Sequence, residues 1–139
     1  MYKKILLAYD GSEAAQLALA AGLNLAKIHG AELWALAVQE RRPGFSGPID
    51  EVEEEKEFSN QQYGKLLEGV RRLAQEAGIE LKTLMRLGLP AKIIIDVAKE
   101  GGFDLVILGH IGLAGVWELM GTTAEKVSRH APCSVMIVR

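Results

Sequence analysis

The sequence predicts an α/β domain in which helices cover both faces of an open, mostly parallel, five-stranded sheet. Five short apolar segments recur along the 139 residues, and amphipathic helical segments separate them. Strands that are covered on both faces are expected to be nearly continuous apolar runs, and four of the five segments have this character. At this length we expect a single domain, residues 1–139, with a substantial buried core.

The five predicted strands follow one another at regular intervals. In chain order they are KILLAY (4–9), AELWALAV (31–38), IELKTLMRL (79–87), FDLVILG (103–109) and SVMIVR (134–139). The third strand alternates apolar residues with Lys82, Thr83 and Arg86, which indicates one wetter face and therefore an edge of the sheet. The last strand ends the chain, where a sheet edge could pair with its copy in a second subunit.

Four helices are expected between the strands, and residues that start or stop helices bound them. Their patterns cover residues 14–28, 63–77, 90–100 and 123–130. Ser12 is the expected N-cap of the first helix and Gly30 its stop. Pro90 suits the first turn of the third helix, and Pro132 prevents the fourth from continuing.

The connection from Gln39 to Asn60 interrupts this regular alternation. It contains two prolines, two glycines and an acidic run. We expect its first half to be a loop and the acidic part to begin the next helix, where Asp and Glu suit the helix dipole. One interpretation is a solvated surface excursion, and the other is a lid over the carboxyl edge of the sheet or a partner-docking segment.

The composition excludes several classes of protein. Hydrophobic residues make up 49% and charged residues 24%, and the net charge is −2. These values argue against a disordered or membrane protein, and against nucleic acid as the main partner, because phosphate neutralisation needs clustered Lys and Arg. The apolar run Ile5–Ala8 is too short for a signal peptide. Because the single cysteine, Cys133, cannot form an internal disulfide, we expect a cytoplasmic protein with an inert, buried thiol.

A glycine-rich loop after the fourth predicted strand is the candidate functional site. Gly109, Gly112 and Gly121 lie between that strand and a helix start at Thr122 and Thr123. Backbone N–H groups without intervening side chains form an anion-binding cradle, and a helix N-terminus adds unpaired donors. These are the components of a phosphate site. The same residues also fit a structural account, in which TTAE is a capping box and the glycines serve turns.

Three side chains near this edge have alternative interpretations. Asp10 ends the first strand beside the expected switch point in strand order, where ligands bind, or it stabilises the turn with Gly11. His110 could touch phosphate or respond to pH, but backbone donors suffice, so we interpret it as an exposed loop residue. Ser12 is better explained as a cap than as a catalyst. No metal-ligand spacing is evident, so a metal is expected only as Mg²⁺ with a nucleotide.

Four motifs in order resemble the universal stress protein family along nearly the full chain. They are ILLAYDGSEAAQLAL, AVQE, GLPAKIIIDVAKEGGFDLVILGHIG and EKVSRHAPCSVMIV. The resemblance implies a five-stranded α/β sheet and a homodimer joined through the last strands. For one branch of the family it also implies ATP bound at the strand ends.

The resemblance implies roles for nine residues of this sequence. Asp10 would contact the ribose or help organise metal and nucleotide, Ala8 and Tyr9 would line the start of the pocket, and the backbone of Val38 would read the adenine. The residues that would hold the phosphates are Gly109, Gly112, Gly121, Thr122 and Thr123. Eight residues separate Gly112 from Gly121, one fewer than in the ATP-binding branch. The retained glycines and Asp10 favour binding, whereas a displaced Gly121 would place the chain in the ATP-independent branch.

The sequence thus predicts a dimeric ATP-binding protein of stress adaptation, whose nucleotide occupancy changes the surface offered to an unidentified protein partner. The alternative is a dimeric interaction protein of the same fold that binds no nucleotide. An ATP-using enzyme is the least supported function, because the sequence has no evident base, nucleophile or second substrate domain. Slow ATP hydrolysis is compatible with the first hypothesis. ADP, AMP and cyclic AMP fit the same residues.

Overall fold

The computed structural model describes residues 1–40, 49–112 and 122–139, with backbone only for residues 49–60. Strands and helices alternate along these ranges, as predicted. In order they are β1 (Lys4–Ala8), α1 (Glu13–His29), β2 (Glu32–Glu40), α2 (Ile49–Glu76), β3 (Leu81–Gly88), α3 (Pro90–Glu100), β4 (Leu105–Gly109), α4 (Thr122–His130) and β5 (Ser134–Val138).

The strands form one five-stranded sheet in the order β3-β2-β1-β4-β5. Each of the four strand pairs in the described chain is parallel. The predicted fold class is therefore confirmed, and β3 lies at an edge as its alternating sequence indicated. The opposite edge belongs to β5.

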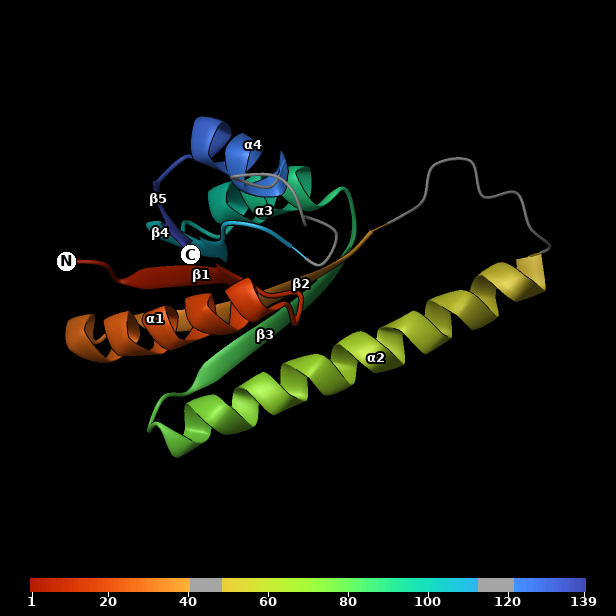
Figure 1. The fold of residues 1–139 in the computed structure, drawn as a ribbon, viewed down its shortest axis with the longest axis horizontal. Helices are drawn as coiled ribbons and strands as arrows, with labels where there is room; N and C mark the ends of the chain where they lie inside the picture. The colour runs from red at the N-terminus through yellow and green to blue at the C-terminus, as the bar shows by residue number, and fades with distance from the viewer. Residues whose placement is uncertain (41–48, 113–121) are drawn as a thin grey trace.

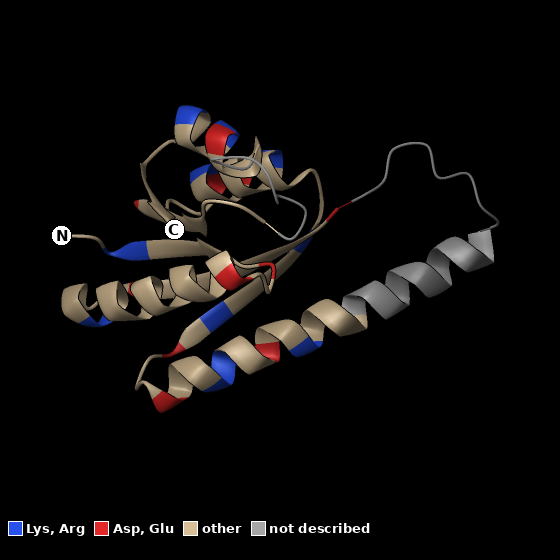
Figure 2. Ribbon diagram, viewed as in Figure 1, with Lys and Arg blue, Asp and Glu red and all other residues tan. Residues whose placement is uncertain are grey.

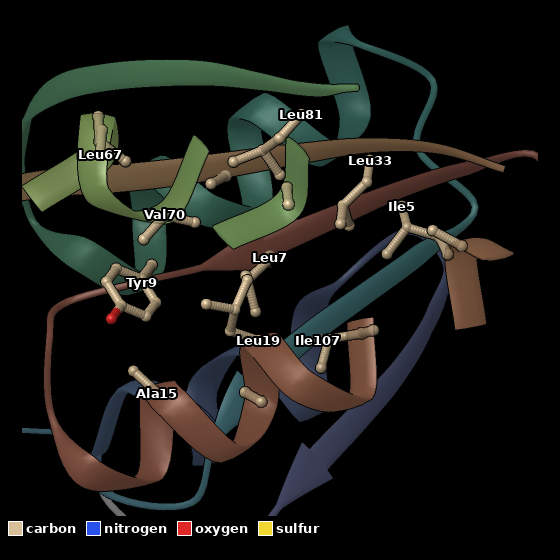
Figure 3. Packing of buried hydrophobic residues seen from close by; sticks show 14 of the residues in the cluster. Ile5, Leu7, Tyr9, Ala15, Leu19, Leu33, Leu67, Val70, Leu81 and Ile107 are labelled. Carbon is tan, nitrogen blue, oxygen red and sulfur yellow. The ribbon is translucent and has the colours of Figure 1, made fainter. Parts of the chain in front are cut away.

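Helices cover the two faces in pairs, with α1 and α2 on one face and α3 and α4 on the other (Figure 1). Successive residues of β1 pack alternately in the cores on the two faces of the sheet, because side chains alternate along a strand. Leu7 packs on the α1/α2 face and Leu6 on the α3/α4 face. Figure 3 shows the first of these cores, where Leu7 and Ile107 lie against α1.

The predicted helix ends are largely confirmed. Ser12 is the N-cap of α1, and its hydroxyl accepts a hydrogen bond from the backbone N–H of Ala15 at 3.1 Å. Gly30 ends that helix in the left-handed conformation, with φ of 62°. Pro90 occupies the first turn of α3.

Two helix starts bear on the candidate site. Helix α2 begins at Ile49, so the acidic run is helical, as expected. The lid or docking interpretation was made for residues 39–60, of which residues 41–48 lie outside the described residues. Helix α4 begins at Thr122 rather than after it, and the Glu125 carboxylate pairs with Arg129 at 2.9 Å. The capping-box prediction was therefore wrong in register, because Thr122 is already helical and Glu125 bonds forward along the helix.

Charged residues of both signs are interspersed along the described helices and strands (Figure 2). In the described ranges no helix is both long and apolar enough to span a membrane.

Candidate functional site

The order of the strands creates a switch point between β1 and β4. From β1 the chain builds outward through β2 to β3, whereas β4 and β5 extend the sheet in the opposite direction. Open α/β sheets bind ligands at the carboxyl ends of the strands at such a point, because the two connections diverge there and leave a crevice. Asp10 follows the end of β1, and Gly109 ends β4, so the predicted residues flank this point.

Asp10 is half-buried, and its two carboxylate oxygens have different surroundings. Oδ1 accepts a hydrogen bond from the backbone N–H of Ser12 at 2.9 Å, so the turn-stabilising interpretation is confirmed. Oδ2 lies 2.9 Å from the position that a Cβ atom on Gly112 would occupy. The loop after β4 therefore approaches the carboxylate with bare backbone, and any side chain at position 112 would press against Asp10.

Ala8 and Tyr9 lie beneath this edge on opposite faces of the sheet. Ala8 is half-buried against the α3/α4 core, whereas the Tyr9 side chain is buried among residues of α1 and α2 (Figure 3). Burial raises the pKa of the Tyr9 hydroxyl, and the nearby charge of Asp10 raises it further. The Tyr9 side chain thus packs in the α1/α2 core next to this edge, and its backbone N–H donates a hydrogen bond to the carbonyl of Leu36 at 2.9 Å.

Val38 turns its backbone toward the space beyond the end of β1. Leu36 is in register with Ala8, and alternate residues of a parallel strand face the same neighbour. Two residues further along, Val38 therefore directs its N–H and C=O to the side of β1 again. Strand β1 ends at Ala8, so the position opposite Val38 is that of Asp10. A planar group lying above Asp10 would meet these backbone donors and acceptors.

The two described glycines of the loop have different surroundings. A Cβ atom on Gly109 would lie 2.6 Å from the Cβ and 2.8 Å from the backbone carbon of Ala14 in α1. Glycine at position 109 is therefore required for the packing of β4 on α1, whatever else it contacts. Gly112 instead approaches the Asp10 carboxylate, where a Cβ atom would be too close to Oδ2. Gly121 lies outside the described residues.

The threonines lie at the positive end of the α4 dipole. Thr122 is exposed and Thr123 half-buried in the first turn of this nine-residue helix. Their hydroxyls and the free N–H groups of the first turn are potential anion donors. Ser12 is already engaged as the cap of α1, so it does not offer a free nucleophile.

Two residues near the site differ from the sequence prediction. Tyr63 was not assigned to the site, and His110 is more buried than expected. Burial raises the pKa of Tyr63, and the charges of Asp10 and Glu40 raise it further, so this α2 side chain lies near both carboxylates. Its neighbour Leu66 lies 3.1 Å from where a Cβ on Gly11 would be. His110 was interpreted as exposed, but it is half-buried, and its Nδ1 is buried with no hydrogen-bond partner among the described residues.

A groove of about 730 Å³ lies elsewhere, beside the start of β3. Three of its polar side chains are paired, since Arg71 donates to the Thr83 hydroxyl at 3.2 Å and Lys82 pairs with Glu32 at 2.7 Å. The groove lies at the amino-terminal ends of the strands, opposite the edge where this architecture binds ligands. We therefore assign the candidate site to the carboxyl edge. Among the side chains described, no three His, Cys, Asp or Glu residues converge as a metal site.

Comparison with known proteins gives concordant results along the whole chain. The universal stress protein family model matches residues 1–139. Universal stress protein YxiE of Bacillus subtilis is 34% identical over 148 aligned positions, which cover 100% of both chains. The solved structure of universal stress protein UspA from Lactobacillus plantarum has 31% identity and a TM-score of 0.90, covering 99% of this chain and 98% of its own.

A more distant structure is a universal stress protein in complex with cAMP. It has 22% identity and a TM-score of 0.77, covering 99% of this chain and 97% of its own. At that identity the likeness concerns the fold.

Proposed function

The chain belongs to the universal stress protein family, and we propose that it binds an adenine nucleotide, ATP with Mg²⁺, at the carboxyl edge between β1 and β4. The observation that carries the proposal is the approach of Gly112 to the Asp10 carboxylate at the switch point of the sheet. A side chain at position 112 would close this space. We place the ribose beside this carboxylate, where the close approach of the loop requires glycine.

The charged and polar groups at this edge favour one orientation of the bound nucleotide. A carboxylate accepts hydrogen bonds and repels anions, so Asp10 suits the ribose hydroxyls rather than the phosphates. Val38, opposite Asp10, offers its backbone to the adenine. The phosphates then extend along the loop from Gly112 toward Gly121 and the first turn of α4, where Thr122 and Thr123 add hydroxyl donors.

A divalent cation is expected with the triphosphate. Asp10 and Glu40 place negative charge at the same edge, as their common effect on the pKa of Tyr63 indicates. Bringing a triphosphate to this edge without a counter-charge would be electrostatically unfavourable. Mg²⁺ usually arrives with phosphates and keeps several of its waters, so it needs few protein ligands.

Binding is proposed to regulate rather than to convert the nucleotide. Ser12 is committed to capping α1, and the groups near Asp10 provide a binding surface. We propose a cytoplasmic homodimer joined through β5, in which occupancy of the edge changes the surface offered to a protein partner. Such a switch requires that ATP bind the two surface states with different affinities. The alternative is a dimeric interaction protein with the same fold, in which the loop serves packing alone.

Calorimetric titration with Mg-ATP tests the proposal after any nucleotide bound during expression has been stripped and identified. The informative variant is Gly112→Ala, because the backbone of Gly112 does not need positive φ and the new Cβ would lie 2.9 Å from Asp10 Oδ2. We expect micromolar or tighter binding by the original chain and at least about a tenfold loss in the variant, equivalent to about 1.4 kcal/mol.

Gly69→Ala is the matched control. A Cβ at position 69 meets no atom within 4 Å, so this variant should bind as the original chain does. Asp10→Asn adds a second comparison, because an amide oxygen can keep the Ser12 hydrogen bond while the charge is removed. Absence of ATP binding up to millimolar concentration in the original chain would favour the alternative.

A further inference from the structure

Tyr63 is an aromatic side chain beside the candidate edge to which the proposed site gives no role. It lies on the core-facing side of α2, where residues at positions 63, 67, 70 and 74 recur at helical spacing. Leu67 and Val70 are buried in the α1/α2 core together with Tyr9 (Figure 3), and Ala74 is buried in the same core. Tyr63 packs against this core but is only half-buried. Its ring therefore lies where the buried side of α2 ends.

The direction of α2 places Tyr63 at the carboxyl edge of the sheet. Because β2 and β3 are parallel, the helix that joins them runs back from the carboxyl edge to the amino edge, alongside β3 (Figure 1). From Ala74 back to Tyr63 the helix rises about 16 Å toward the carboxyl edge. Leu66, one turn after Tyr63, lies 3.1 Å from where a Cβ on Gly11 would be. Tyr63 is one turn further toward the edge, and therefore lies beside or beyond the turn that holds Asp10.

The charges around Tyr63 agree with this position. Burial raises the pKa of its hydroxyl, and the charges of Asp10 and Glu40 raise it further. Asp10 follows β1 and Glu40 ends β2, so a side chain near both lies where these two neighbouring strands end. Val38, whose backbone is proposed to face the adenine, is two residues before Glu40. The ring of Tyr63 thus borders the space that we assign to the base.

We propose that Tyr63 is a base-contacting residue of the nucleotide site, with its ring packed against the adenine on the α2 side. This inference rests on the proposed function and deepens it, because it adds an aromatic side chain to a base site otherwise described by the backbone of Val38. Every base has a planar face on which an aromatic ring can stack. Packing against the α1/α2 core orders the ring before the ligand arrives, so little freedom is lost on binding.

Calorimetric titrations of the stripped, full-length chain with Mg-ATP and with AMP test this contact. Tyr63→Leu keeps an apolar side chain against the core but removes the aromatic face, whereas Tyr63→Phe keeps the ring and loses only the hydroxyl. We expect Tyr63→Leu to weaken binding of both nucleotides about tenfold, equivalent to about 1.4 kcal/mol, because both carry the same base. Tyr63→Phe should bind both within about twofold of the original chain.

Tyr2→Leu is the matched control. Tyr2 is also a half-buried tyrosine packed against the α1/α2 core, but it precedes β1 and lies at the opposite, amino-terminal edge of the sheet. The same substitution at this position should leave the binding of both nucleotides unchanged.

A measurement on the unaltered chain removes any dependence on variants that fail to fold. Nuclear Overhauser effects between the ring protons of Tyr63 and those of the adenine should appear in the complex with Mg-ATP. Unchanged affinity in Tyr63→Leu, an equal loss in Tyr2→Leu, or no such effect at saturating ATP would overturn the assignment of Tyr63 alone. If the unaltered chain binds neither ATP nor AMP up to millimolar concentration, the proposed function fails together with it.

Discussion

Two glycines of one loop perform different tasks. Gly109 lets β4 pack directly on the backbone of α1, with Ala14 where its Cβ would be, whereas Gly112 lets the loop approach the Asp10 carboxylate. The sequence predicted both as phosphate-binding residues, because a glycine in a loop has the same signature whether it makes room for a ligand or for a helix. Only the packing of α1 separates the two tasks.

Gly109→Ala is therefore expected to act on stability. The new Cβ would overlap the backbone of α1, and overpacking of this kind costs about 1–3 kcal/mol. Urea unfolding should show the loss as a lower midpoint. Gly69→Ala, in an open position of α2, should instead be neutral or stabilising by up to about 1 kcal/mol. Equal stability of the two variants would contradict the close approach of β4 to α1.

His110 and Tyr63 show why part of the site could not be predicted from sequence. The backbone N–H of His110 donates to the carbonyl of Val138 in β5, 28 residues later in the chain, so its partial burial could not be predicted from its local sequence. Tyr63 lies in α2 more than 50 residues after Asp10, whose charge raises its pKa, and nothing in its local pattern distinguishes it from a core residue. The position of Asp10 was predictable, because the apolar runs of the sequence locate the end of the first strand and their order indicates the switch point of the sheet.

At the scale of elements, local chemistry predicted the helices well. Ser12, Gly30 and Pro90 start or stop helices through hydrogen bonds and φ angles that involve only neighbouring residues. The start of α4 was shifted by one residue, because TTAE resembles a capping box whether or not Thr122 is helical. The edge position of β3 was predictable because its wetter face leaves alternation in the sequence.

Ser12→Ala tests the contribution of the α1 cap. The hydroxyl that accepts from Ala15 N–H would be lost, and the expected loss in the free energy of unfolding is about 1 kcal/mol, within the 0.5–2 kcal/mol typical of such caps. Ser128→Ala is the comparison, since Ser128 is exposed within α4 and its hydroxyl bonds the Glu125 carbonyl of its own helix. Chemical unfolding that ranked Ser128→Ala as the more damaging change would contradict the cap.

At the scale of the whole molecule, the sheet ends in an edge strand that a second subunit can extend. Val138 directs its carbonyl to β4 through His110, so alternation turns the backbone of Ile137 toward the open edge. We predict a homodimer through β5 that Ile137→Pro weakens at least tenfold, because proline removes the outward N–H. Ile137→Ala is the control, since it loses the side chain but keeps that N–H.

Size-exclusion chromatography with light scattering at several concentrations measures this association. The original chain and Ile137→Ala should have twice the mass of one chain at concentrations where Ile137→Pro dissociates. A single-chain mass for the original protein, or equal dimerisation of both variants, would contradict an interface through β5.

The central claim, that nucleotide binds at the switch point between β1 and β4, is tested most directly by mapping amide chemical shifts during a titration with Mg-ATP. The account predicts that the largest changes occur at Ser12, Val38, Gly112 and Thr123, all at the carboxyl edge of the sheet. The groove beside β3, lined by Arg71 and Lys82 among others, lies at the opposite ends of the strands and should stay unchanged. Changes concentrated in that groove, or none at saturating ATP, would contradict the account.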